Sequence, residues 1–273
     1  MEFILITNNT DIAKYAEDCG VHRILVDLEL IGKVERQGHL NTVISYHTLK
    51  DVENIRKVLN YSKLMVRVNP INIQSKNEID SVINAGAEIL MLPMFKYPYE
   101  VKNFISFINK KAKTNLLFET PQALVRVDDI IEIEGIDEIH IGLNDLHLGM
   151  GLDFMFELLS GGIVEYLATK FKNKNIKFGF GGIARLGYGK VDSSIILSEH
   201  IRIGSQIVIL SRDFTQNAKT YEELINKLDL KEELQKINKY IDYLKNANYE
   251  IFKKNQDILK LKIKEIIKKD GSF

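Results

Sequence analysis

Cysteine, proline and tryptophan are scarce or missing in this sequence of 273 residues, which has one cysteine, four prolines and no tryptophan. The single cysteine, Cys19, excludes an internal disulfide framework and a cysteine-rich zinc site. No apolar run approaches the roughly 20 residues needed to cross a bilayer. The N-terminus, MEFILITNNT, has an acidic second residue and then only four consecutive apolar residues, unlike a signal peptide. We therefore expect a cytoplasmic protein that does not enter a membrane.

An excess of either charge is also lacking. The chain has 37 Lys and Arg against 37 Asp and Glu, for a formal net charge of zero. Nucleic-acid-binding proteins normally carry a basic excess on one face, so this balance argues against a nucleic-acid partner. The hydrophobic fraction of 45% and the charged fraction of 27% are ordinary for a folded, soluble chain.

Proline and glycine are unevenly distributed along the chain. All four prolines lie at or before Pro121, and no glycine occurs between Gly204 and Gly271. The turns are thus concentrated in the first part, and the segment from about 215 to 270 is typical of uninterrupted helix. We predict a barrel domain over residues 1–213 and a C-terminal helical extension over 214–273.

The first part alternates short apolar runs with longer helical patterns. Eight runs have the length and composition of strands buried on both faces, at 3–7, 22–28, 63–68, 88–94, 115–119, 138–142, 176–181 and 206–210. Helical patterns lie between them, for example at 48–60, 75–86 and 99–112, and the second has a Ser75/Glu78 capping box. Eight strands alternating with helices predict a (β/α)8 TIM barrel. A doubly wound sheet is the alternative, but no G-x-G-x-x-G follows the first strand.

Polar residues follow several of the predicted strands. Active sites of barrels lie where the strands end, so these residues are the first candidates for chemistry. They are Asp27, Glu29, Arg67, Asn69, Glu119, Asn144, Asp145 and the glycine-rich segment 179–189.

Two of these carboxylates suggest a metal site. Glu119 ends one predicted strand and Asp145 follows the next, and neighbouring strands lie only about 5 Å apart. Two carboxylates, completed by water and a bidentate substrate, suit Mg²⁺ or Mn²⁺ better than tetrahedral Zn²⁺. Alternatively, Asp145 caps the next helix and Glu119 is a surface residue of the rim.

Positive charges and glycines complete the candidate site. Arg67 ends a buried strand, where its guanidinium could bind a substrate carboxylate or enolate oxygen, or pair internally with Asp27 or Glu119. Glycines near Asp145 would let backbone approach a ligand, namely Gly142, Gly149 and Gly151. The segment GFGGIAR could bind an anion, or it could be only a turn, with Gly181, Gly182 and Arg185 as its candidate contacts. Lys33 and Arg36 could also bind substrate.

Five blocks in order resemble the superfamily of metal-dependent pyruvate aldolases (2-keto-3-deoxy sugar-acid and hydroxy-oxo-acid aldolases) and citrate lyase β-subunits. They are VDLE with GKVERQ, VRVNP, AGAEILMLPM, FETPQA and IGLNDLHLGMG, and the similarity extends from residue 3 to about 212. The resemblance implies a barrel of the phosphoenolpyruvate/pyruvate-binding type. It also implies metal binding by Glu119 and Asp145, enolate stabilisation by Arg67, and an acidic strand-2 residue at Asp27, with Glu29 beside it.

One position departs from the resemblance. The aldolases commonly have Asp-Gly-Glu-His after the second strand, and this histidine belongs to their acid–base pair. Here the sequence is Asp27-Leu28-Glu29-Leu30, so the general base cannot be transferred. The candidates are a water activated by the cation or one of three histidines, each of which could instead be structural, namely His47, His39 and His147.

The C-terminal segment has a heptad-like apolar seam. Leu230, Leu234, Ile237, Ile241 and Leu244 are spaced by four and three residues, and the same register continues through 248, 251, 255 and 258. Such a seam predicts a partner helix, in the same chain or in a second copy. Alternatively, residues 246–248 form a turn between two helices that pack on the barrel. We expect a homo-oligomer, with this segment as its candidate interface.

Together these features predict a divalent-metal-dependent carbon–carbon lyase. It would join or cleave pyruvate, or a related 2-keto acid, and an aldehyde. Two alternatives stay open: a citrate-lyase-like lyase of acyl-CoA thioesters, and a catalytically silent barrel with an assembly role.

Overall fold

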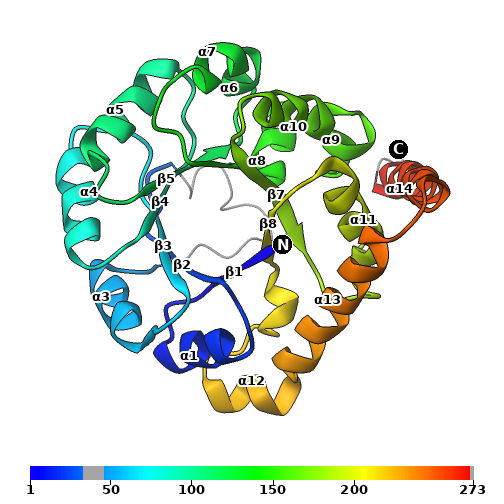
Figure 1. The fold of residues 1–273 in the computed structure, drawn as a ribbon, viewed down its shortest axis with the longest axis horizontal. Helices are drawn as coiled ribbons and strands as arrows, with labels where there is room; N and C mark the ends of the chain where they lie inside the picture. The colour runs from blue at the N-terminus through cyan, green and yellow to red at the C-terminus, as the bar shows by residue number, and fades with distance from the viewer. Residues whose placement is uncertain (33–45, 271–273) are drawn as a thin grey trace.

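The computed structural model describes residues 1–32 and 46–270. Eight parallel strands close into a barrel in chain order, and the first strand also pairs with the last (Figure 1). This confirms the predicted (β/α)8 barrel. The strands are β1 (Glu2–Ile6), β2 (Arg23–Asp27), β3 (Lys63–Arg67), β4 (Ile89–Leu92), β5 (Lys113–Phe118), β6 (Glu138–Ile141), β7 (Lys177–Ile183) and β8 (Ile207–Leu210).

The strands are apolar on both faces because one face packs inside the barrel and the other packs against the helices. β2, β4 and β6 are buried at every position. Side chains that point inward form a small apolar cluster inside the barrel, which includes Ile4, Leu25, Met65, Met91 and Leu117. Outward-pointing side chains join the surrounding helices in a much larger core. Alternation of side chains along each strand thus places every second residue inside the barrel.

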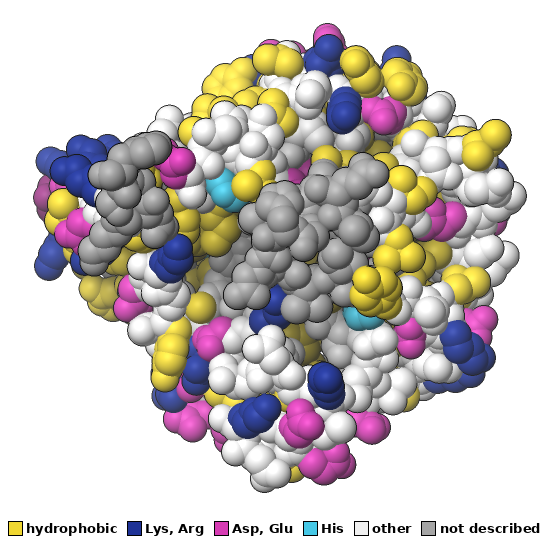
Figure 2. All heavy atoms as spheres, turned by 180° about the vertical axis from the view of Figure 1, so that it is seen from behind, with side chains coloured by type: hydrophobic (Ala, Val, Ile, Leu, Met, Phe, Trp, Pro, Cys, Tyr) yellow, Lys and Arg dark blue, Asp and Glu magenta, His cyan; other side chains and the backbone are white. Residues whose placement is uncertain are grey.

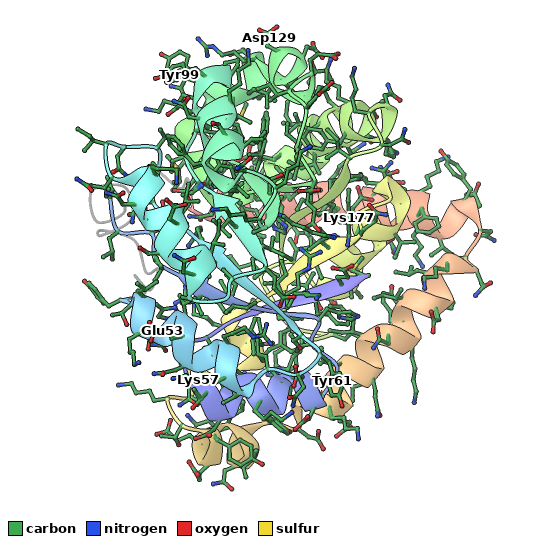
Figure 3. The ribbon with its side chains drawn as sticks, turned by 60° about the vertical axis from the view of Figure 1, so that its left-hand side comes forward. Glu53, Lys57, Tyr61, Tyr99, Asp129 and Lys177 are labelled. Atoms are coloured by element: carbon green, nitrogen blue, oxygen red, sulfur yellow. The ribbon has the colours of Figure 1, made fainter. Side chains whose placement is uncertain are left out.

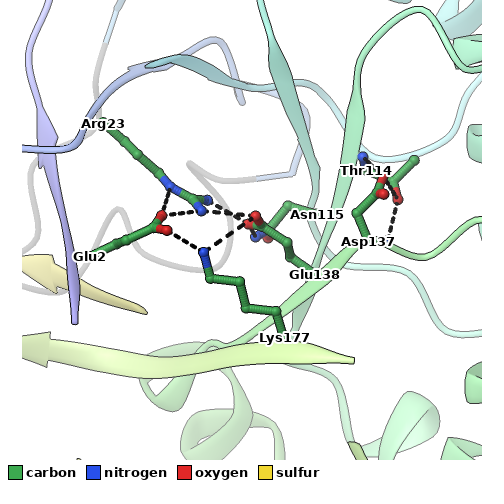
Figure 4. A network of polar contacts seen from close by, with 7 residues as sticks. All are labelled: Glu2, Arg23, Thr114, Asn115, Asp137, Glu138 and Lys177. Atoms are coloured by element: carbon green, nitrogen blue, oxygen red, sulfur yellow. Dashed lines mark hydrogen bonds and ion pairs between the residues drawn. The ribbon is translucent and has the colours of Figure 1, made fainter. Parts of the chain in front are cut away.

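The N-terminal end of the barrel is closed by charged side chains (Figure 4). Arg23 donates from Nε to Glu2 at 2.7 Å and from Nη2 to Glu138 at 2.8 Å. Lys177 pairs with Glu2, and Asn115 Nδ2 donates to Glu138 at 3.3 Å. These residues come from five strands, so the network joins opposite sides of the barrel at the end away from the candidate site.

The helices form the outer wall. α3 shows why they fold: Val52 and Ile55 are buried against the barrel, whereas Glu53 and Lys57 lie on the outer side (Figure 3). The Thr48–Asp51 capping box begins this helix. The described helices that follow the strands up to β7 are α1 (Thr10–Asp18), α3 (Leu49–Val58), α4 (Ser75–Asn84), α5 (Pro98–Ile108), α6 (Pro121–Val125), α7 (Val127–Ile131), α8 (Leu143–Gly149), α9 (Glu157–Ser160), α10 (Ile163–Asn173) and α11 (Ser193–Ile203).

The surface reflects the balanced composition. Acidic and basic side chains are interspersed on the face that Figure 2 presents. Within the described ranges, no helix has an apolar stretch long enough to cross a membrane.

The predicted Ser75/Glu78 capping box is wrong. The residue that caps α4 is Gln74, and its side chain makes no capping bond. Ser75 Oγ accepts from the backbone N–H of Asn72 at 2.8 Å. The Glu78 carboxylate accepts from the N–H and the side-chain amide of Asn69, at 3.1 and 2.8 Å. Both side chains therefore fasten the loop after β3 and leave the helix N-terminus uncapped.

The predicted uninterrupted helix after residue 215 is also wrong. A 3₁₀ turn, η1 (Arg212–Phe214), is followed by three helices: α12 (Tyr221–Lys227), α13 (Leu230–Lys245) and α14 (Tyr249–Asp270). The break before α14 is a turn at residues 246–248, where Asn248 Oδ1 accepts from the N–H of Ile251 at 3.2 Å. Asparagine side chains compete for backbone hydrogen bonds in this way, and apolar periodicity alone does not detect it.

The apolar seam packs on the chain's own barrel. Leu230, Leu234, Ile237, Ile241 and Leu244 are all buried, and α13 and α14 both contact α11. In α14 the predicted position Asn255 is buried, but beyond it Leu259 and Ile263 are buried and the predicted Ile258 is only partly buried. Asn255 does not face a partner helix of another copy but donates to Ser198 of α11 at 2.9 Å.

Candidate active site

A cavity of about 540 Å³ opens at the C-terminal ends of the strands. Its walls contain most of the candidate residues, from the ends of β2, β3, β5, β6 and β7. The predicted residues that line it are Asp27, His47, Arg67, Glu119, Gly142, Asn144, Asp145, Gly181 and Gly182. Barrel geometry therefore gathers residues that are up to 155 positions apart in the sequence, from Asp27 to Gly182.

Arg67 is held in place by a bidentate ion pair. Its Nε and Nη2 donate to the two carboxylate oxygens of Asp27, at 2.8 and 2.7 Å, and Glu29 lies 3.4 Å from Nε. Asp27 and Arg67 are direct neighbours in the register of β2 and β3. Burial alone would lower the pKa of Arg67, but the charges of Asp27, Glu29 and Glu119 outweigh burial and raise it. The guanidinium is thus permanently charged and fixed in orientation, and its Nη1 donors have no hydrogen-bond partner among the described residues.

His47 lies on the other side of Asp27. Its Nδ1 accepts the backbone N–H of Asp27 at 3.0 Å. The proton of the neutral imidazole therefore resides on Nε2. This arrangement occupies the Nδ1 lone pair with a backbone N–H, so His47 offers no free basic nitrogen on that side of the ring.

Glu119 is a buried carboxylate among other carboxylates. It is 3% exposed, so it is not a surface residue of the rim. Burial raises the pKa of Glu119 well above its ordinary value, and the nearby charges of Asp145 and Glu29 raise it further. The N–H of Met94, in a left-handed conformation with φ of 56°, donates to Glu119 Oε1 at 3.1 Å. One oxygen of Glu119 is thus anchored beside a neighbouring carboxylate.

Gly142 is needed for this packing. A Cβ at residue 142 would lie 2.7 Å from Glu119 Oε2 and 2.7 Å from its Cβ. Gly142 precedes α8, and Asp145 lies in the first turn of this helix instead of capping it. Asp145, from the start of α8, and Glu119, from the end of β5, therefore both line the cavity.

These oxygen donors fit a hard divalent cation. Crowded carboxylates that share a buried edge are favourable when a cation neutralises them. In the described part of the chain, no three His, Cys, Asp or Glu side chains form a complete metal-binding group. Two carboxylates with the rest of the shell from water and substrate remain consistent with the sequence prediction.

Arg185 does not line this cavity. It forms a bidentate ion pair with Asp213, from Nε at 2.9 Å and from Nη2 at 3.1 Å, and its guanidinium stacks 4.0 Å from the ring centroid of Tyr188. The geometry thus gives Arg185 a structural role in holding the segment after β8. The other predicted substrate contacts, Lys33 and Arg36, and the candidate base His39 lie outside the described residues.

Two residues of the cavity with titratable side chains were missed in the sequence. Arg212 follows β8, lines the cavity and is exposed, and its guanidinium has no ion-pair partner among the described residues. His140, inside the barrel on β6, donates from Nε2 to the carbonyl oxygen of Gly181 at 2.9 Å, and burial lowers the pKa of this histidine to about 4. Arg212 could have been predicted, because it follows the eighth strand just as the other candidate residues follow theirs. His140 stands in an apolar run and gave no signal.

Comparison with known proteins now identifies the family. The sequence profile of the HpcH/HpaI aldolase/citrate lyase family matches residues 3–155, a segment that contains Asp27, Arg67, Glu119 and Asp145. The chain belongs to the HpcH/HpaI aldolase/citrate lyase family. A search of curated proteins found no significant match.

Solved structures share the fold of this family. An HpcH/HpaI aldolase from Desulfitobacterium hafniense DCB-2 is 13% identical, with a TM-score of 0.62, over 84% of this chain and 93% of its own. An HpcH/HpaI aldolase/citrate lyase family protein from Burkholderia cenocepacia J2315 is 14% identical, with a TM-score of 0.63, over 87% of this chain and 94% of its own. At such low identity the likeness establishes the barrel. Membership of the family supports a function of the aldolase or carbon–carbon lyase kind.

Proposed function

We propose that this family member is a divalent-metal-dependent aldolase. It would join or cleave a bond between an aldehyde and the enolate of pyruvate or a related 2-keto acid. The observation that carries this proposal is the pairing of Glu119 and Asp145 at one edge of the cavity, close enough for Asp145 to raise the pKa of Glu119. Arg67, whose pKa Glu119 helps to raise, supplies the fixed positive charge of the same site.

Glu119 and Asp145 would hold the cation, for which Mg²⁺ and Mn²⁺ are the best candidates. When bound, the ion would polarise the keto and carboxylate oxygens of the 2-keto acid. Asn144 lines the same wall and can donate from its side-chain amide to a substrate oxygen.

Arg67 would stabilise negative charge that develops on the substrate. Its orientation is set in advance by Asp27, so no rearrangement is needed as the charge forms. His47 would help to position Asp27, because its Nδ1 accepts the backbone N–H of Asp27. Arg212 adds a second positive charge to the cavity and so favours anionic keto acids as substrates.

The other proposals follow from the sequence. A cytoplasmic location is proposed because the single cysteine leaves no internal disulfide. The expected homo-oligomer stays a prediction, but the seam of α13 is buried against α11 and is not available to a second copy. The proposed partners are small molecules, a keto acid and an aldehyde.

One assay separates the leading function from its alternatives. Purified protein is incubated with Mn²⁺ and pyruvate in heavy water, and the methyl protons of pyruvate are followed by NMR. An aldolase should exchange them without any aldehyde. A citrate-lyase-like enzyme should act only on an acyl-CoA. A silent barrel, suggested by Leu30 in place of the aldolases' histidine, should show no metal-dependent turnover with either.

A further inference from the structure

A second cavity of about 410 Å³ adjoins the active-site cavity. The two share three lining residues: Asn144, Met155 and Gly182. The second cavity therefore continues the first between the ends of β6 and β7 and α11. Its volume is within the range of about 300–1,000 Å³ typical of small-molecule sites.

The walls of the second cavity are apolar and well packed. Phe154 and Phe156 meet edge to face, with ring centroids 5.3 Å apart. Ile183, Val191 and Ile196 are also buried, so core side chains of the barrel and α11 form part of the walls. The apolar lining consists of Phe154, Met155, Phe156, Ile183, Ala184, Val191 and Ile196.

The backbone around β7 makes room for this cavity. The pairing of β7 with β8 shifts register between Gly179 and Gly182, and such irregularities often re-aim the chain beside active sites. Gly189, at the other wall, has φ of 104°, and a Cβ there would lie 2.7 Å from the carbonyl oxygen of Val191. A side chain at residue 189 is therefore excluded by the same backbone geometry that shapes the wall.

Polar groups in this lining are few and mostly engaged. Ser193 Oγ donates to the carbonyl oxygen of Arg185 at 2.6 Å, and Lys190 already has an interaction partner. His147, the third candidate base, lines this cavity and not the catalytic one, and its Nδ1 is 3.1 Å from the carbonyl oxygen of Leu143. No carboxylate lines the cavity among the described residues. Without a carboxylate, the lining disfavours a cationic ligand, and its apolar side chains favour an uncharged one.

We propose that this cavity binds an apolar substituent of the aldehyde substrate, such as an alkyl chain or an aromatic ring. The inference rests on the proposed function, since it requires the reacting carbonyl to lie in the adjoining cavity. Met155 and Gly182, which border both cavities, mark the passage from the reacting end of the substrate to its apolar end. The preference among aldehydes would then depend on how much apolar surface of the aldehyde is buried in this cavity.

The first test compares straight-chain aldehydes from acetaldehyde to hexanal in condensation with pyruvate. Each methylene that becomes buried should raise kcat/KM by up to about fourfold, so hexanal should exceed acetaldehyde by at least about tenfold. Equal kcat/KM values along the series would overturn the inference.

The second test fills the cavity. Ala184 is half-buried and lines it, so Ala184→Leu should place three extra carbons in the space and reduce the hexanal-to-acetaldehyde ratio at least fivefold. Ala184→Ser, which hardly changes the volume, should keep most of the ratio. Val125→Leu, at a position that is 79% exposed, is the remote control and should keep the wild-type ratio. A ratio that Ala184→Leu leaves unchanged would contradict the proposal.

A binding measurement separates this inference from the proposed function. Calorimetry with 1-hexanol, without metal or pyruvate, should show binding to the wild type and much weaker binding to Ala184→Leu, with ethanol as the negative control. If pyruvate exchange fails but hexanol binds as expected, the aldolase proposal falls and the apolar site stands. If exchange succeeds but hexanol binds both proteins equally, the site is refuted.

Discussion

Replacing Glu119 by glutamine tests the proposed metal pair with little change of shape. The amide oxygen can still accept the N–H of Met94, so packing should be preserved. The pKa of Glu119 lies above its ordinary value of 4.5, so the folded state binds this proton more tightly than the unfolded state. Ionising Glu119 therefore costs stability as the pH rises above about 4.5. Without metal, Glu119→Gln should be at least as stable as the wild type at pH 8.

With bound metal, the wild type should instead become more stable than Glu119→Gln. At a Mn²⁺ concentration of about 100 times Kd, binding stabilises the wild type by about 2.7 kcal/mol. For a chain of this size, each kcal/mol corresponds to about 2–4 °C, so the melting temperature should rise by about 5–10 °C. A site weakened a hundredfold by the loss of one of two carboxylates would gain only about 0.4 kcal/mol at the same concentration. Glu119→Gln should therefore shift by no more than about 2 °C.

Thermal melts with and without Mn²⁺ measure both effects. Glu53→Gln, on the outer side of α3 (Figure 3), is a matched control and should respond to metal as the wild type does. The reasoning is refuted if the wild type shows no metal-dependent shift, or if Glu119→Gln shifts as much as the wild type.

Three further predictions concern the fold. Glu138→Gln leaves the buried Arg23 paired with Glu2 alone, so urea denaturation should show a loss of about 1–3 kcal/mol; an unchanged free energy of unfolding would contradict this. Ile237→Ala removes a fully buried side chain from the seam of α13 and should cost about 2–5 kcal/mol, whereas an unchanged denaturation midpoint would show that the helix is not packed. His140 has a folded pKa of about 4, below its ordinary 6.5, so stability should fall by about 2 kcal/mol between pH 7 and pH 5, as the unfolded state takes up the proton. His140→Gln should reduce this pH dependence, and an identical slope in both proteins would argue against it.

Strand positions were predictable because a strand that is buried on both faces has a continuous run of apolar residues in the sequence. All eight predicted runs overlap an observed strand, and the run at 63–68 matches β3 (Lys63–Arg67) to within one residue. The ends of the strands then located Asp27, Arg67, Glu119 and Asp145 correctly at one cavity, since barrel closure brings such ends together whatever their distance in sequence.

Side-chain pairing was less predictable. The interpretation of Arg185 as an anion ligand failed because its partner Asp213 lies 28 residues away and is brought close only by β8. The apolar spacing favoured a continuous helix, but the alternative of a turn at residues 246–248 is confirmed, and a local hydrogen bond of Asn248 stabilises it. Arg67 forms the internal pair with Asp27 that was one of its two interpretations, and it also lines the cavity, so substrate binding by Arg67 stays a prediction.

The proposed chemistry is tested most directly by the exchange of pyruvate methyl protons in heavy water, with Mn²⁺, by the wild type and by Asp145→Asn. The substitution keeps the shape of the side chain and removes one of the two proposed ligand charges. We predict metal-dependent exchange by the wild type and a loss of at least about a hundredfold in the variant, at an unchanged melting temperature without metal. Exchange by Asp145→Asn at the wild-type rate, or no exchange by the wild type, would contradict the proposed mechanism.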